Sequence, residues 1–184
     1  DEESQAELMY LAAVPRQIIS PQNNASIVGI FQDSMLGSAR FTRENINFDA
    51  RQAMNLLMYY DNVNPTLFKD HTKKISSFEI LSQILPPLST RMKNGVYGEG
   101  AIEEDTKTSN NIIEIVNGKY IRGQLDKGAL GKGSKGLLQT IFNDFNHTES
   151  ANFIDNLQSI VTEYMKLSSY SVGISDLIAD PETN

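Results

Sequence analysis

The sequence predicts an α+β fold in which several helices surround a small antiparallel hairpin or sheet within a single compact domain. Two helix starts marked by capping pairs, one Asn-Gly turn between apolar segments and two amphipathic stretches near the C-terminal end carry this prediction. The 184 residues, 40% hydrophobic and 21% charged, provide enough apolar surface for one core and lie in the ordinary globular range.

Two segments in the first half carry helix-start signals. Gln52 follows Asp49 by three residues, and Glu79 follows Ser76 by the same spacing. This is the spacing of a capping box, in which each side chain accepts a hydrogen bond from the backbone N–H of the other residue. The first helix is expected to bury one apolar face, formed by Ala53, Met54, Leu57 and Met58. The second helix has apolar staple positions before and after its cap and ends at a proline pair, namely Ile75, Ile80 and Pro86-Pro87.

The second half predicts a hairpin followed by two helices. Asn117-Gly118 joins the strand segments 112–116 and 119–125, because this pair tolerates the positive φ angles that a tight hairpin turn needs. Segments 134–145 and 148–167 are predicted to be helices that pack against each other as antiparallel neighbours. The second of these helices carries apolar residues spaced for one buried stripe: Ile154, Leu157, Val161, Tyr164 and Met165.

The remaining segments carry weaker signals. A helix is expected up to Ala13, followed by a turn at 20–24 and a brief strand from Ile27 to Phe31. Residues 89–111, which include the acidic run Glu103-Glu104-Asp105, have little periodicity and are predicted to be a mobile loop or insertion. A further helix is expected to begin at Ser175-Asp176.

Charge and composition exclude several function classes. A net charge of −7 argues against a free-standing nucleic-acid binder, because lysine and arginine supply most of the affinity for phosphates. The chain has no cysteine, which excludes disulfides and thiolate metal sites, and its two histidines are far apart in sequence. It has no apolar run long enough for a membrane span. One basic strip stands out: Lys119, Arg122, Lys127, Lys132 and Lys135.

The glycine-rich segment 131–136 satisfies the spacing of the dinucleotide fingerprint, G-x-G-x-x-G. That fingerprint requires a parallel βαβ unit, whereas the sequence predicts an antiparallel hairpin before the segment and helices after it. The spacing also fails as a phosphate loop, because Gly133 is followed by Ser-Lys rather than Lys-Ser. Two interpretations of this segment therefore remain open. It attracts phosphate through the nearby lysines, or it is an ordinary solvated glycine turn.

A second polar feature is the pair Gln32-Asp33, which has apolar neighbours on both sides. If buried, this pair must be hydrogen-bonded, and a structural and a functional role are equally compatible with the sequence.

Ordered matches to one known protein family run along nearly the whole chain. The main matches are Val14-Pro15, Gln17 to Asn23, Gly29-Ile30, Gln32-Asp33 and Leu36-Gly37. Further matches are Ala6-Glu7-Leu8, Phe41-Thr42-Arg43, Met54 to Leu57, Ile84-Leu85-Pro86, Asn117-Gly118, Gly123, Leu130-Gly131, Gly136-Leu137 and Gly173 to Asp176 with Ile178-Ala179-Asp180. In their order and spacing, these segments resemble the largest subunit of multisubunit DNA-directed RNA polymerases of the eukaryotic or large-DNA-virus type.

This resemblance implies a pore domain over residues 1–168 and the start of a funnel domain over 169–184. The domain would line the channel through which nucleotides enter, while the loop holding the catalytic magnesium would precede residue 1, so its ligands lie outside this fragment. The fragment itself contributes no catalytic or metal-binding residue and is expected to be inactive alone. The expected supports of the magnesium loop are Ser20, Pro21, Gln22, Asn23, Asn24, Gln32 and Asp33, and the expected channel-facing charges are Lys127, Lys132 and Lys135.

The expected partners in the complete enzyme are the other polymerase subunits, template DNA, RNA, nucleoside triphosphates and a transcript-cleavage factor, with no membrane. The sequence departs from the family pattern at two places. Residues 74–79 replace a segment that contains tryptophan in the family, and Lys127-Gly128 replaces a pair of lysines. This divergence and the high asparagine content suggest a large DNA virus, so the expected location is the nucleus, or the cytoplasm or virion. The alternatives are a self-contained acidic protein-interaction module and a nucleotide-binding enzyme.

Overall fold

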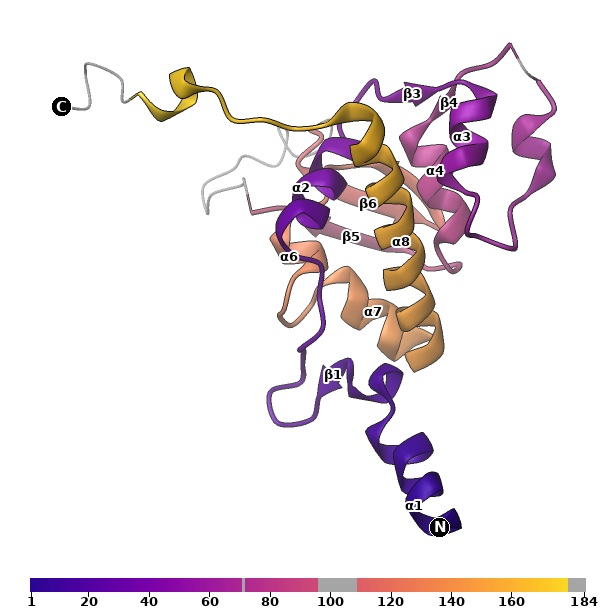
Figure 1. The fold of residues 1–184 in the computed structure, drawn as a ribbon, viewed down its shortest axis with the longest axis vertical. Coiled ribbons are helices and arrows are strands. Elements are labelled where there is room, and N and C mark those ends of the chain that lie inside the picture. The colour runs from indigo at the N-terminus through magenta and orange to yellow at the C-terminus, as the bar shows by residue number, and fades with distance from the viewer. Residues whose placement is uncertain (71, 96–108, 179–184) are drawn as a thin grey trace.

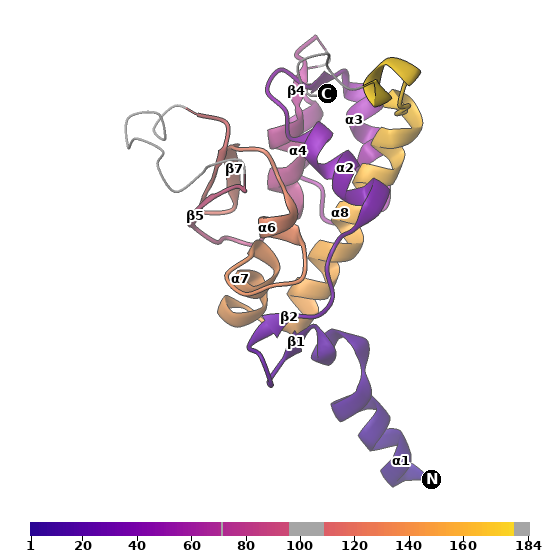
Figure 2. The ribbon, with the colours of Figure 1, turned by 90° about the vertical axis from the view of Figure 1, so that its left-hand side faces the viewer.

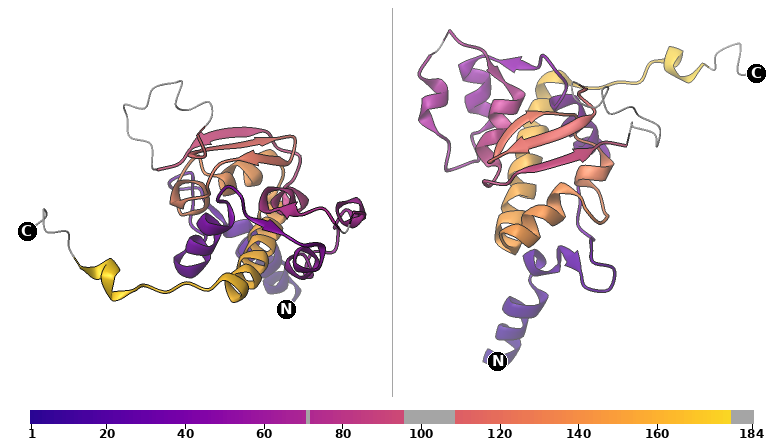
Figure 3. Two further views of the ribbon diagram at one scale, coloured as in Figure 1. Left: turned by 90° about the horizontal axis from the view of Figure 1, so that it is seen from above. Right: turned by 180° about the vertical axis from the view of Figure 1, so that it is seen from behind.

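A three-stranded antiparallel sheet and the long helix α8 lie on opposite sides of the hydrophobic core, with shorter helices between them (Figures 1 and 3). The computed structural model describes residues 1–70, 72–95 and 109–178. The sheet has the order β5-β6-β7, and two further pairs of short strands lie outside it. The strands are β1 Ile19–Ser20, β2 Ala25–Ser26, β3 Asn47–Phe48, β4 Ile75–Ser76, β5 Thr90–Lys93, β6 Ile112–Val116 and β7 Lys119–Arg122.

Helix α8 is the centre of the helical layer and contacts α2, α3, α4 and α7, while α4 also packs on β7. The α-helices are α1 Glu2–Glu7, α2 Gln32–Phe41, α3 Ala50–Leu56, α4 Ser77–Ile84, α6 Lys127–Leu130, α7 Leu137–Asp144 and α8 His147–Ser168. Shorter turns of other helix types are the π-helix η1 Leu8–Ala12 and the 3-10 helices η2 Val14–Gln17, η3 Pro65–Phe68 and η4 Ile174–Leu177. The α+β prediction is therefore confirmed.

Three aromatic rings fix α2, β3 and α8 against one another. Phe41, Phe48 and Tyr164 are all buried, and their ring centroids lie 5.1 to 6.0 Å apart. Two of these pairs meet edge to face, the arrangement that aromatic quadrupoles favour. The predicted stripe on α8 is also confirmed, because Leu157, Val161 and Tyr164 are buried while Ile154 and Met165 pack at the edge of the core.

Both capping boxes and the Asn-Gly hairpin are present as predicted. The backbone N–H of Gln52 donates to the Asp49 carboxylate over 2.7 Å, and both reciprocal bonds form at Ser76 and Glu79. The hairpin turn between β6 and β7 has φ values of 48° at Asn117 and 74° at Gly118. A side chain at Gly118 would also meet the Pro86 carbonyl at 2.9 Å.

Four local expectations are wrong. The face of α3 that packs inward carries Ala50, Ala53 and Leu56, so Met54 and Met58 lie at the surface, where they are 45% and 61% exposed. No strand forms at 27–31, because the chain pairs earlier, through β1 and β2. Helix α7 begins at Leu137 rather than Ser134, since Lys135 adopts a positive φ of 66°.

The fourth error lies in the segment 89–111, which was predicted to be a loop. Its first part forms β5, which pairs with β6 from Thr90 opposite Ile115 to Lys93 opposite Ile112. This pairing joins segments about twenty residues apart, so no local pattern in the sequence predicts it. Residues 96–108, with the acidic run Glu103-Glu104-Asp105, lie outside the described residues.

The two ends of the chain project from the core (Figures 1 and 2). Neither α1 nor η1 contains a buried residue, and η4 at the other end is also exposed. Large apolar side chains at both ends are half or more exposed: Leu8, Met9, Tyr10, Leu11, Val14, Leu167, Tyr170, Val172, Ile174, Leu177 and Ile178. Within the ranges that the structure describes, no helix combines the length and apolar character needed to cross a membrane.

Candidate functional site at the junction of the β1–β2 hairpin and the glycine loop

The first part of the site is the β1–β2 hairpin, whose tip is polar and exposed. Ser20 pairs with Ala25, and the four residues between them form the turn: Pro21, Gln22, Asn23 and Asn24. All four are exposed, and Asn24 adopts a positive φ of 46°, which asparagine tolerates better than most residues. The structure therefore presents the predicted polar turn as a surface feature with a defined backbone shape.

The second part is the glycine-rich segment 131–136, which packs against the chain leaving the hairpin and is called the glycine loop below. The N–H of Ser26 donates to the Gly133 carbonyl over 3.0 Å, and the N–H of Ile30 donates to the Leu130 carbonyl over 2.9 Å. Between these bonds, a side chain at Gly29 would lie only 2.9 Å from the Gly131 carbonyl carbon. The two backbones therefore approach too closely for any residue but glycine at position 29.

Gln139 in the first turn of α7 joins the two parts from behind. Its side-chain amide donates to the Asn24 carbonyl over 2.9 Å and to the Asn24 side-chain oxygen over 3.2 Å. Its oxygen accepts from the N–H of Lys135 over 2.6 Å. Gln139 is only 6% exposed, so one buried side chain fixes both the hairpin tip and the glycine loop.

The sequence interpretation did not identify Gln139, although it carried a signal. A glutamine lies among the buried apolar residues Leu137, Leu138 and Ile141 of α7. A polar side chain on an otherwise apolar helix face must find hydrogen-bond partners in the folded protein. No local pattern names those partners, because Asn24 lies 115 residues earlier.

The start of α2 extends the site and decides whether Gln32 and Asp33 are buried, which the sequence left open. Phe31 is 41% exposed and lies under the Lys132 ammonium, which is 5.6 Å from the ring centroid. This cation–π contact places the first residues of α2 beside the glycine loop. Gln32 and Asp33 are both exposed rather than buried among their apolar neighbours, because the helix turns Gly37, Ser38 and Phe41 inward instead.

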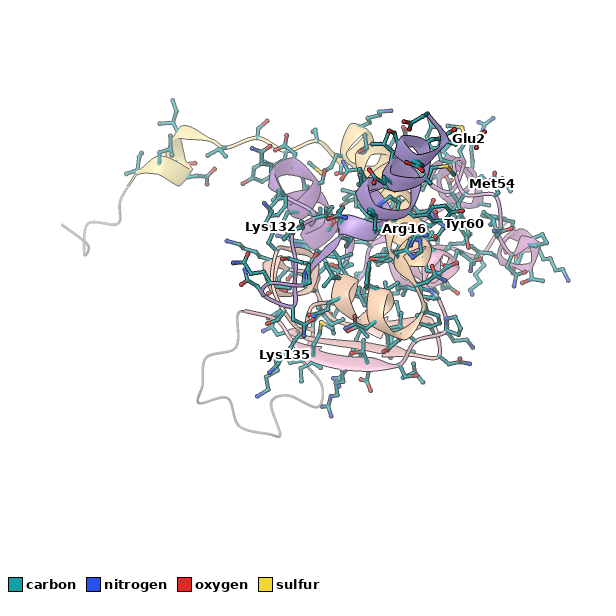
Figure 4. The ribbon with its side chains drawn as sticks, turned by 90° about the horizontal axis from the view of Figure 1, so that it is seen from below. Glu2, Arg16, Met54, Tyr60, Lys132 and Lys135 are labelled. Carbon is teal, nitrogen blue, oxygen red and sulfur yellow. The ribbon has the colours of Figure 1, made fainter. Side chains whose placement is uncertain are left out.

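The basic strip seen in the sequence does not form one patch. Arg122 bonds Glu114 across the sheet over 2.7 Å, and Lys119 lies on the same strand, β7. Lys127 is the exposed first residue of α6, directly before the glycine loop, which carries Lys132 and Lys135. Figure 4 shows the last two apart from each other, Lys132 toward α2 and Lys135 toward the sheet. Three of the five charges therefore belong to this site.

The approach to α6 is rigidly built. The Asp126 carboxylate caps α6 by accepting from the N–H of Ala129 over 3.0 Å, and it also accepts from the N–H of Gly95. Burial raises the pKa of Tyr120, and the nearby charge of Asp126 raises it further. Tyr120 therefore stays protonated and donates to the Gly123 carbonyl over 2.9 Å, which fixes the chain between β7 and α6.

The chemistry available at this junction is binding and positioning. Its polar groups are the turn amides, the pair Gln32-Asp33 and three lysines, which offer hydrogen bonds and positive charge. Across the ranges 1–70, 72–95 and 109–178, no three histidine, cysteine, aspartate or glutamate side chains lie close enough together to hold a metal ion.

Comparison with known proteins gives one consistent family. Residues 17–177 match the sequence profile described as RNA polymerase Rpb1, domain 3. The chain is 27% identical, over 186 aligned positions, to the DNA-directed RNA polymerase II subunits RPB1-A and RPB1-B of Trypanosoma brucei brucei. The alignment covers 98% of this chain but only 10% of each of those two proteins. Since the profile covers most of the chain, this protein belongs to the family of domain 3 of the largest RNA polymerase subunit.

Proposed function

We propose that this chain acts within the largest subunit of a DNA-directed RNA polymerase, where it lines the nucleotide-entry pore and supports the loop that holds the catalytic magnesium. The observation that carries this proposal is the junction itself. An exposed polar turn is fixed from behind by Gln139 and by the glycine loop, so it offers hydrogen bonds in a defined geometry. Such pre-organised supports position a catalytic loop without taking part in the reaction.

In this proposal Ser20, the turn 21–24 and Gln32-Asp33 bond the backbone of the magnesium loop, while the metal ligands lie outside the described chain. Phosphoryl transfer relies on the metal ions and their carboxylates to stabilise developing charge. The chain would affect that step only by holding the loop in place. By itself, the chain is expected to synthesise no RNA.

The three lysines have a separate role in the proposal. Nucleoside triphosphates and displaced RNA are polyanions, and a channel lined by positive charge raises their local concentration. Lys127, Lys132 and Lys135 are exposed around one loop in a chain of net charge −7, so this loop would attract polyanions locally although the chain as a whole is acidic.

Partners follow from the exposed apolar ends. Isolated apolar side chains on a surface need no explanation, but η1 exposes four large ones in succession, Leu8 to Leu11. We propose that this segment and the tail after α8 pack on other parts of the polymerase, with template DNA, RNA, nucleoside triphosphates and a transcript-cleavage factor as further partners. The tail 169–184 would begin the funnel domain. The enzyme would act in the nucleus, or in the cytoplasm or virion if a large DNA virus encodes it.

The support role is tested with Asp33→Asn in the assembled polymerase. Loss of the negative charge and of one of the two acceptor oxygens should raise the magnesium concentration needed for half-maximal elongation, because the loop would be held less firmly. Asp155→Asn is the matched control, since Asp155 is an exposed aspartate on α8 that is not among the residues proposed to support the loop. An equal magnesium dependence for both variants and the unmodified enzyme would contradict a supporting role for Asp33.

The channel role is tested with Lys127→Glu in the assembled polymerase. Elongation at limiting nucleotide, or rescue of backtracked complexes, should slow more at low than at high salt, because salt screens charges over about 8 Å at physiological ionic strength. Lys69→Glu, an exposed lysine after η3, is the control for charge alone. Unchanged rates across the salt series would exclude a channel role for Lys127.

A further inference from the structure

A cavity of about 240 Å³ lies on another side of the molecule, between α8 and the segment that follows α3. Ile84 and Phe153, both buried, contribute its apolar walls. Its remaining lining is polar and comes from Tyr59 to Asn62 and from α8. Figure 4 shows Tyr60 on the same side of the molecule as Met54 of α3. The junction described above shares no lining residue with this cavity.

The α8 side of the cavity is one continuous helix face. Glu149, Asn152, Phe153 and Asn156 are spaced at i, i+3, i+4 and i+7, so they align along the helix. Three of these four side chains are polar and face a hollow rather than a neighbouring element. They provide one carboxylate and two amide groups around the same space.

The opposite wall adds acceptors and aromatic rings. Asp61 provides a second carboxylate, Asn62 a third amide, and Tyr59 and Tyr60 two rings. Burial raises the pKa of Tyr60, and the negative charge of Glu149 raises it further, which places that carboxylate within electrostatic reach of the phenol. No lysine or arginine is among the lining residues. The cavity therefore carries two negative charges that its own walls leave without a basic side chain.

The size and chemistry of the cavity select its occupant. Small-molecule sites span about 300 to 1,000 Å³, so about 240 Å³ suits a single long side chain rather than a whole ligand. A guanidinium group presents five N–H donors in one plane, which matches carboxylate and amide oxygens, and its flat face stacks on aromatic rings. A lysine ammonium offers three donors from one point and stacks less well.

We propose that this cavity binds the guanidinium group of an arginine side chain presented by a neighbouring polypeptide. The carboxylates of Asp61 and Glu149 balance its charge, the oxygens of Asn152 and Asn156 accept its remaining N–H groups, and a tyrosine ring covers its face. This interaction is independent of the function proposed for the junction.

The experiment uses the 184-residue chain, whose own core is complete enough to hold α8 against α2, α3, α4 and α7. N-acetyl-arginine amide is titrated while NMR follows the side-chain amide of Asn152 and the ring of Tyr60. N-acetyl-citrulline amide has nearly the same shape but no charge, and N-acetyl-lysine amide has the charge without the planar fork. Arginine should bind at least about fivefold more tightly than either comparator.

Two variants locate the binding within the cavity. Glu149→Gln and Asp61→Asn should each weaken arginine binding about fivefold, the effect of losing one partly exposed charge pair. Helix α8 still begins normally in Glu149→Gln, because the side chain of Asn146 caps it through the backbone N–H of residue 149. Asp155→Asn removes the same charge from the same helix outside the cavity and should leave the affinity unchanged.

Several results would overturn the proposal. Equal affinity for arginine and citrulline would show that charge plays no part, and tighter binding of lysine would show that the planar fork plays none. Displacement of arginine by millimolar magnesium chloride would identify a metal site instead. An equal effect of Asp155→Asn and Glu149→Gln would indicate general attraction to an acidic chain, and the absence of any saturable shift would exclude binding.

Discussion

Replacing Gln139 by methionine should loosen the junction while leaving the rest of the core intact. Methionine has a similar length and volume, so it fills the same space but provides neither donor nor strong acceptor. Three hydrogen bonds are lost: two to Asn24, at 2.9 and 3.2 Å, and one from the N–H of Lys135, at 2.6 Å. All three depend on one side chain that is 6% exposed.

The size of the effect follows from what happens to the released partners. A net contribution of about 1 kcal/mol per hydrogen bond would give about 3 kcal/mol. Asn24 and Lys135 are both exposed, however, so water can form hydrogen bonds with some of the groups that lose their bond to Gln139. We therefore expect the free energy of unfolding to fall by about 2 kcal/mol, with an unchanged dependence on denaturant concentration.

Two measurements check this expectation. Urea unfolding gives the global loss, and hydrogen exchange at the Ser26 amide, which bonds the Gly133 carbonyl, reports local opening of the junction. Gln158→Met is the matched control, because Gln158 makes one exposed hydrogen bond to Ser34 over 2.6 Å and should lose less than about 0.5 kcal/mol. Equal losses for the two variants, or unchanged exchange at Ser26 in Gln139→Met, would refute the claim that Gln139 joins the hairpin to the glycine loop.

Three further predictions concern stability. Gly118→Val should cost about 1 kcal/mol or more, because the turn needs a positive φ, and an unchanged melting temperature would contradict the turn. Thr42→Val should cost about 1 to 3 kcal/mol by leaving the buried N–H of Leu125 without its acceptor at 2.9 Å, whereas Thr42→Ser should keep most of that stability in the same urea titration. Burial acts to raise the pKa of Glu79, but hydrogen bonds from Lys73 and the backbone at the helix start outweigh it, so the pKa is lowered. A carboxyl whose pKa is lowered on folding stabilises the protein at pH values above its unfolded-state pKa of about 4.3, and this stabilisation is lost as the pH falls through the folded-state pKa. In Glu79→Gln the free energy of unfolding should therefore depend less on pH between roughly pH 5 and 3.

The elements predicted correctly are those whose signal lies within a few residues. A capping box needs only the residues at its two ends, and an Asn-Gly turn needs only two positive φ angles, so both were visible at Asp49, Ser76 and Asn117-Gly118. The long stripe on α8 was equally clear, because it repeats over several turns. Local chemistry decided these elements, and the fold preserved them.

The elements predicted wrongly depend on partners that are distant in sequence. Strand β5 exists because β6 lies beside it, and its own four residues alternate only weakly between half-buried and exposed positions. The exposure of Met54 depends on which face of α3 packs against the neighbouring elements, and that face carries Ala50, Ala53 and Leu56. The sequence also left open whether Gln32-Asp33 is buried, and the fold decides this because the face that α2 turns inward begins at Gly37. A single sequence does not encode such pairings as a local pattern.

The glycine loop shows why a short motif needs its structural context. Its spacing fits a dinucleotide fingerprint, yet the sheets in the described ranges are antiparallel and the loop follows the short helix α6 rather than a strand. Its backbone instead serves contacts within the protein, since Gly133 accepts from Ser26 and Gly131 lies against Gly29. Glycines have no side chain, so they allow another group to come close to their backbone. In a dinucleotide site that group is the cofactor, whereas here it is the β1–β2 hairpin. The motif is therefore explained by packing, and the role proposed for the site rests on the exposed polar tip and lysines that this packing holds in place.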